Sequence, residues 1–126
     1  MNGQKSVCIL LVDDEERNIK LLQAVLHAEG YSSISATNGC DARELAQSKL
    51  PDLILLDMMM PGLDGVSTFE RFKQDPSMKE IPIIFMTAKV QKNEVEGYRK
   101  LGAKGVIIKP FDPLSLAEEI MEILEE

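Results

Sequence analysis

The fold of this chain is indicated most clearly by residues 51–65, whose sequence is PDLILLDMMMPGLDG. Four consecutive apolar residues, 53–56, end at an aspartate, Asp57, and a loop with Pro61 and Gly62 follows. A short apolar run bounded by turn residues is typical of a strand that is buried on both faces. Strands of this kind occur in parallel sheets that helices cover on both sides, so the stretch indicates an α/β fold.

Outward from this strand, short apolar runs alternate with helical patterns along the chain. Further strands are expected at residues 7–12, 31–36, 81–86 and 105–108. Helices are expected at residues 15–29, at 38–49 with Asn38 as cap, around Val66, Phe69 and Phe72, at 94–101, and from Pro113 onward. A succession of β-α units predicts a parallel sheet with helices on both faces. The strand at 31–36 has the weakest pattern and suits an edge of that sheet.

Composition limits the classes of protein to which the chain can belong. A length of 126 residues fits one domain spanning residues 1–126, and 44% apolar with 28% charged residues is an ordinary globular mixture. The formal net charge of -7 argues against a nucleic-acid-binding surface. No apolar run approaches the ~20 residues that span a bilayer, and the polar start lacks the apolar core of a secretory signal. We therefore expect a cytoplasmic protein that does not bind membranes, with Cys8 and Cys40 as free thiols.

Polar side chains stand where four of the expected strands end. They are Asp13 and Asp14 after the first strand, Asp57 after the third, Thr87 after the fourth and Lys109 after the fifth. Ligands of such sheets bind beyond the carboxyl ends of the strands, so these side chains are expected to meet. Three carboxylates at the centre of a sheet repel one another and favour a bound cation. Because the ligands are hard oxygens and no Cys or His is near, Mg²⁺ is the expected ion.

This set of residues has the parts of a site that accepts a phosphoryl group. A divalent ion beside Asp57 would offset the repulsion between that carboxylate and an incoming phosphoryl group. Thr87 can donate a hydrogen bond to one phosphoryl oxygen, and Lys109 can pair with another. The same repulsion between carboxylates predicts that Mg²⁺ stabilises the fold and that Asp13→Ala raises the metal-free stability.

Four segments together resemble the response-regulator receiver family of two-component signalling, including its chemotaxis-regulator-like single-domain members. They are LLVDDE at 10–15, PDLILLDMMMPGLDG at 51–65, IPIIFMTA at 81–88 and GAKGVIIKPF at 102–111. The resemblance implies a five-stranded parallel sheet in the order 2-1-3-4-5, in a flavodoxin-like three-layer sandwich. It also implies a phosphorelay function: the domain takes a phosphoryl group from a phosphohistidine of a sensor histidine kinase or histidine phosphotransfer protein. Its surface then switches for an output partner.

The resemblance also assigns roles to single residues. Asp57 matches the phosphoacceptor, and Thr87 and Lys109 match the hydroxyl and the lysine of the site. The family's Mg²⁺ ligands match Asp14 directly, Asp13 through water, Asp57, and the backbone carbonyl of Met59. Such a domain assists its own phosphorylation and dephosphorylation but is not a turnover enzyme. A monomer or transient dimer that binds neither nucleic acid nor membrane is expected.

Some positions differ from the best-known members of the family. Many of them carry a Tyr or Phe three residues before the lysine, where this chain has Val106. We therefore hypothesise a switch through Thr87 and the following loop, with Val106 filling vacated space. In the family the positions of Met59 and Lys89 lie near the attacking water. Neither side chain is a good acceptor for that water, so slow hydrolysis of the aspartyl phosphate is expected. The Lys109–Pro110 bond is often cis in the family.

Three other interpretations of the sequence were weighed. Aspartyl phosphatases of the haloacid-dehalogenase type need a second Asp where this chain has Met59. A flavin phosphate would be repelled by the acidic residues that follow the first strand. An interaction module without phosphorylation would not require all the site residues, and all are present. The sequence is compatible with a single-domain regulator and with a receiver cut from a longer protein.

Overall fold

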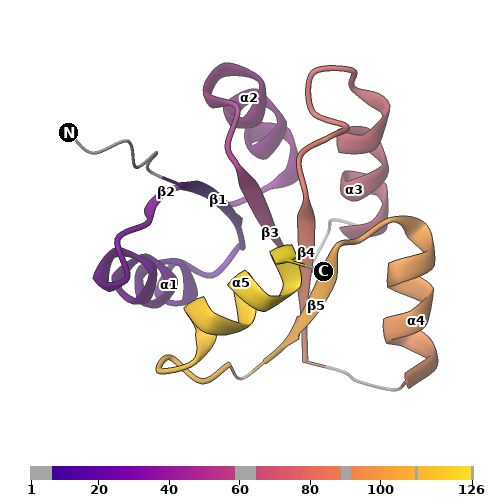
Figure 1. Ribbon diagram of the computed structural model, residues 1–126. Coiled ribbons are helices and arrows are strands. Elements are labelled where there is room, and N and C mark those ends of the chain that lie inside the picture. The colour runs from indigo at the N-terminus through magenta and orange to yellow at the C-terminus, as the bar shows by residue number, and fades with distance from the viewer. Residues whose placement is uncertain (1–6, 59–64, 89–91, 110, 126) are drawn as a thin grey trace.

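Strands and helices alternate along the chain in the computed structural model, which describes residues 7–58, 65–88, 92–109 and 111–125 (Figure 1). The strands are β1 (Cys8–Val12), β2 (Ser32–Ala36), β3 (Leu53–Asp57), β4 (Ile83–Thr87) and β5 (Gly105–Ile108). The helices are α1 (Glu16–Ala28), α2 (Gly39–Lys49), α3 (Gly65–Gln74), α4 (Lys92–Leu101) and α5 (Leu116–Glu125). The expected succession of β-α units is confirmed.

The five strands form one parallel sheet in the order β2-β1-β3-β4-β5, and β3 lies at its centre. The expected order is confirmed, and the weakly patterned β2 lies at an edge. The register aligns Val12 with Leu56, Asp57 with Met86, and Thr87 with Ile108. The carboxyl ends of β1, β3, β4 and β5 therefore reach nearly the same level, and the residues that follow them share one end of the sheet.

Helices cover both faces of the sheet and make a three-layer sandwich (Figure 1). Leu22 and Leu26 of α1 pack with Ile120 of α5 in one buried cluster. On the other face, α2 and α3 supply a second cluster, which includes Phe69 and Phe72. Tyr98 of α4 packs against that second cluster. β3 is buried along its whole length, as its apolar run predicts.

Several element boundaries differ from the expected ones by one to three residues, and two of these differences have a clear local reason. α5 begins at Leu116, so the expected start at Pro113 is wrong by three residues. The preceding residues form a turn in which an Asp112 carboxylate oxygen accepts a hydrogen bond from the Leu114 amide at 2.9 Å. β4 begins at Ile83 because Pro82 has no N–H to donate, although its carbonyl still accepts from the Ile54 amide at 3.0 Å.

The contact between β5 and α5 depends on the missing side chain of Gly105. A Cβ atom at this position would lie 2.5 Å from Cγ2 of Ile123, which is itself buried. Gly105→Ala should therefore push α5 from the sheet and lower the free energy of unfolding by about 1–3 kcal/mol. Denaturant unfolding measures this change. Gly97→Ala in α4 is the matched control, because a Cβ there meets nothing within 4 Å. A helical alanine should stabilise slightly, so equal losses in both variants would contradict the packing argument.

Among the described residues, no helix has both the length and the apolar character needed to cross a membrane.

Candidate functional site

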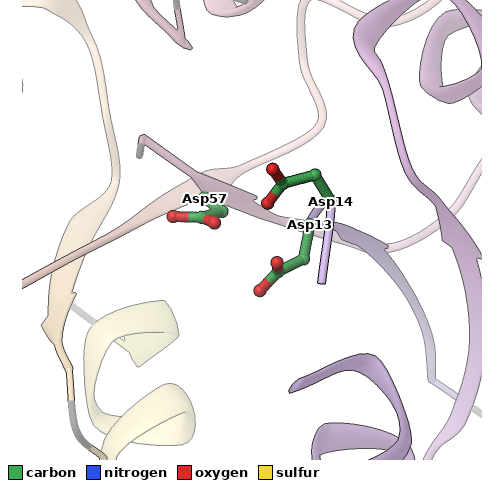
Figure 2. Close-up of side chains that lie close together, drawn as sticks. All are labelled: Asp13, Asp14 and Asp57. Carbon is green, nitrogen blue, oxygen red and sulfur yellow. The ribbon is translucent and has the colours of Figure 1, made fainter. Parts of the chain in front are cut away.

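Three carboxylates meet at the carboxyl end of the central strands (Figure 2). Asp13 and Asp14 follow β1, and Asp57 is the last residue of β3. One carboxylate oxygen of each lies within 4.8 Å of the others. Asp13 is 2% exposed and Asp57 3% exposed, whereas Asp14 faces solvent. The convergence expected from the sequence is confirmed, and two of the three charges are held where water solvates them poorly.

Backbone hydrogen bonds hold these aspartates in place. The Asp13 amide donates to the Ala36 carbonyl at 3.1 Å, which continues the pairing of β1 with β2 by one residue. The Asp13 carboxylate accepts from the Glu15 amide at 2.9 Å, at the point where α1 begins. Beyond Asp57, the Met58 amide donates to the Met86 carbonyl at 2.9 Å. The carboxylates are therefore attached to the ends of paired strands, where their positions are well defined.

Lys109 brings a positive charge between the two buried carboxylates. Its Nζ lies 3.4 Å from Oδ2 of Asp13 and 3.3 Å from Oδ2 of Asp57, and its side chain is 18% exposed. The Lys109 amide donates to the Thr87 carbonyl at 2.9 Å, which fixes the backbone from which this side chain reaches inward. The ammonium offsets part of the repulsion that the sequence predicts. The sequence placed Lys109 at this end of the sheet but did not indicate that it joins Asp13 to Asp57.

Thr87 is the last residue of β4, beside the strand that carries Asp57, and it is 3% exposed. Because Asp57 pairs with Met86, Thr87 lies one residue beyond Asp57 along the strand direction. Its carbonyl is held by Lys109, as described above. Thr87 thus stands at the end of the sheet where the acidic residues meet, as expected.

Some expectations fall on residues outside the described ranges. They are the Met59 carbonyl as a metal ligand, the placing of Lys89, and the Lys109–Pro110 bond. Met58 and Gly65, the described residues on either side of residues 59–64, show one feature that the sequence analysis missed. A Cβ on Gly65 would lie 2.7 Å from the sulfur of Met58, so α3 begins in close contact with the residue after Asp57. The sequence signal for this close contact is Gly65, the second glycine of the PGLDG segment.

Val106 pairs in register with Phe85 and is partly buried against the same cluster. The ring of Phe85 contacts two others at centroid distances of 5.0 Å: Phe69 of α3 and Tyr98 of α4. Both contacts are edge-to-face, a favourable geometry for aromatic rings. The rings of Phe69, Phe85 and Tyr98, here called the aromatic row, therefore connect α3, β4 and α4 beside Val106 of β5.

The donor set fits Mg²⁺. Carboxylate oxygens are its preferred protein ligands, and Mg²⁺ keeps several of its waters, which suits the exposure of Asp14. Within the described ranges, the acidic triad of Asp13, Asp14 and Asp57 is the group of three or more Cys, His, Asp or Glu side chains close enough to share an ion. No sulfur or imidazole ligand belongs to it, so the softer transition metals are disfavoured.

Comparison with known proteins places the chain in a family. The model of the response regulator receiver domain matches residues 9–121. The response regulator PleD of Caulobacter vibrioides is 39% identical over 119 residues, which are 94% of this chain and 26% of PleD. The polar-differentiation response regulator DivK of Brucella anthropi is 34% identical over 116 residues, which are 92% of this chain and 94% of DivK. The chain thus spans about a quarter of the length of PleD and nearly all of DivK.

Solved structures agree with this result. The chemotaxis response regulator CheY4 of Vibrio cholerae superposes with a TM-score of 0.87 at 25% identity, covering 94% of this chain and 99% of CheY4. The signal receiver domain of a DNA-binding response regulator from Colwellia psychrerythraea gives 0.83 at 29% identity, covering 96% and 100%. The flavodoxin-like fold and the two-component resemblance are confirmed. This chain belongs to the response regulator receiver domain family of two-component signalling.

Proposed function

We propose that the chain accepts a phosphoryl group on Asp57 in a Mg²⁺-dependent reaction, from a phosphohistidine of a sensor kinase or phosphotransfer protein. The observation that carries the proposal is the placing of Asp57. It is a buried carboxylate at the end of the central strand, within 4.8 Å of two more carboxylates and 3.3 Å from an ammonium. A carboxylate in this position can give up its contact with the ammonium when it forms a bond to a phosphoryl group.

In the proposed transfer, a carboxylate oxygen of Asp57 attacks phosphorus, and the P–N bond to the donor imidazole breaks. The electron pair of that bond leaves with the imidazole. When bound, Mg²⁺ supplies positive charge against the phosphoryl oxygens, and Asp13, Asp14 and Asp57 would hold it. The Lys109 ammonium, which contacts the Asp57 carboxylate at rest, pairs with a phosphoryl oxygen. Thr87 donates its hydroxyl to another.

The phosphoryl group then remains on the protein, so the domain acts as a signalling switch and not as a turnover enzyme. The Thr87 hydroxyl moves toward the phosphoryl group, and this movement is transmitted along β4 to the residues that pack against the strand. Phe85, two residues before Thr87 on the same strand, contacts Tyr98 of α4 and is paired with Val106. The aromatic row through Tyr98 can thus take the signal to α4 although position 106 is not aromatic.

The test is chemical phosphorylation. The purified chain is incubated with a small acyl phosphate such as acetyl phosphate, with Mg²⁺ or in its absence, and intact mass is recorded. We expect one acid-labile phosphoryl group per chain, formed only with Mg²⁺. Failure to label under either condition, in protein that is folded by circular dichroism, would overturn the proposal.

A second consequence of the proposed site is stabilisation by Mg²⁺. An ion that binds only the folded chain adds RT ln(1 + [L]/Kd), or about 1.4 kcal/mol at ten times Kd. The melting temperature should therefore rise with Mg²⁺ in the wild type and much less in Asp14→Asn, whose exposed carboxylate is replaced without disturbing the core. A melting temperature that ignores Mg²⁺, or an equal rise in both proteins, would contradict the metal site.

The structure changes one expectation about Asp13. Repulsion alone predicts that Asp13→Ala raises the metal-free stability. However, Asp13 also pairs with Lys109 at 3.4 Å and accepts the Glu15 amide at 2.9 Å. Removal of the carboxylate loses both interactions along with the repulsion. We therefore no longer expect a gain in metal-free stability from Asp13→Ala.

A further inference from the structure

A second group of charges lies at the opposite end of the sheet. A pocket of about 540 Å³ is lined by Lys73, Lys79, Arg99 and Lys104, together with one carboxylate, Glu80, and is here called the basic pocket. Lys104 directly precedes β5, and the turn that carries Lys79 leads into β4. The basic pocket is thus at the amino ends of β4 and β5, whereas Asp57 and Thr87 are the last residues of β3 and β4.

The charge of the basic pocket is opposite to that of the molecule. The chain has a formal net charge of -7 and 14 Lys and Arg residues, and four of these 14 line this one pocket beside a single carboxylate. Cations in the last turn of a helix stabilise its exposed carbonyls, which accounts for Lys73 in α3 and Arg99 in α4. Lys79 lies in the turn before β4, so the helix dipole does not account for it, and Lys104 is the residue that directly precedes β5.

Lys73 is held in position before any ligand binds. Its Nζ donates a hydrogen bond to the Lys79 carbonyl at 3.2 Å and lies 5.6 Å from the centre of the Phe69 ring. Burial lowers the pKa of Lys73, and the nearby charge of Glu80 partly opposes that effect. A partly desolvated ammonium gains more from an anionic partner than one in open water does. The pocket therefore presents at least one cation that is already ordered, which reduces the entropy lost on binding.

We infer that the basic pocket binds a small phosphate-bearing ligand with two or more negative charges. Its volume is spread over a depression that is open to solvent, so a ligand there would be held mainly by the charges around it. Several cations around one pocket match the compact charge of a phosphate or diphosphate group better than the spaced carboxylates of an acidic peptide. Pro82, Ala103 and Leu124 add apolar surface for an uncharged part of the ligand. The site is separate from Asp57, and the inference does not depend on phosphorylation there.

The experiment follows backbone amide chemical shifts of the full chain by NMR, without divalent ions. Pyrophosphate and adenosine diphosphate are the probes, adenosine is the uncharged control, and hexaglutamate is the peptide control. We expect saturable shifts centred on Ala103 and Lys104 with both phosphate probes, and unchanged binding in Asp57→Asn. Lys79→Gln combined with Lys104→Gln should weaken binding by about tenfold or more.

The matched control for charge is Lys49→Gln combined with Lys100→Gln. Both lysines are exposed in the last turns of their helices, and neither lines the basic pocket. This control should weaken binding by less than about twofold. Equal weakening in both double variants would show a diffuse charge effect and overturn the inference. So would the absence of saturable shifts, shifts centred on Lys109, or hexaglutamate binding as tight as that of pyrophosphate.

Discussion

Asp57→Asn should reduce phosphoryl labelling by an acyl phosphate at least about 100-fold, which corresponds to roughly 2.7 kcal/mol or more in the barrier. An amide oxygen of the same shape is a far weaker nucleophile than a carboxylate, and it cannot form a stable acyl phosphate at this position. The substitution is nearly isosteric at a residue that is 3% exposed, so the core around β3 should keep its packing. Labelling is followed by intact mass with Mg²⁺ present, and the modified residue is mapped in the wild type.

Asp52→Asn is a suitable control for this substitution. Asp52 directly precedes β3, at the end of the strand opposite to Asp57, and accepts a hydrogen bond from the Cys8 amide at 2.8 Å, a role that an Asn oxygen can keep. This variant should label at the wild-type rate and extent. If Asp57→Asn retained full label, the acceptor would be another residue, and the roles proposed for Lys109 and Thr87 would also be contradicted.

Much of the fold and the place of the site could be predicted because both depend on a pattern repeated along the chain. Apolar runs such as residues 53–56 identify buried parallel strands, and the carboxyl ends of parallel strands share one end of the sheet. That rule puts Asp13 and Asp57 at the same end of the sheet, and the strand order that the family resemblance implies places their strands side by side. The cap at Asn38 was also predictable, since its side chain accepts the Asp41 amide within a single turn.

Features that depend on contacts between distant segments were not predictable. The Nζ of Lys109 contacts Asp13, 96 residues earlier, at a distance that only the packed sheet determines. The same is true of Gly105, whose small size is needed because Ile123 packs directly on it. The sequence drew attention to the missing aromatic at position 106, but Tyr98 supplies an aromatic contact to Phe85 from a different element. The pattern identifies which residues are available, and packing decides which of them meet.

The ion pairs of Lys109 lead to the second large effect. Lys109→Met should lower the metal-free free energy of unfolding by about 2–4 kcal/mol, because the variant leaves two buried carboxylates without this cation. The 18% exposure of the side chain favours the lower part of that range, since solvent screens the charge in part. Lys100→Met, at an exposed position of α4, removes the same charge and should change stability by less than about 0.5 kcal/mol.

Mg²⁺ distinguishes the loss of this charge from a simple loss of packing. The ion would supply positive charge to Asp13 and Asp57, so it should stabilise Lys109→Met by more than it stabilises the wild type. A cavity left by a poorly packed methionine would gain nothing extra from the ion. Asp57→Asn combined with Lys109→Met should also lose less than the sum of the two single variants, because the neutral amide removes one of the uncompensated charges. Denaturant unfolding of the four proteins, with and without Mg²⁺, measures both effects. Equal stabilisation by Mg²⁺ in the wild type and Lys109→Met, with strict additivity in the double variant, would show that Lys109 does not act as the cation of this site.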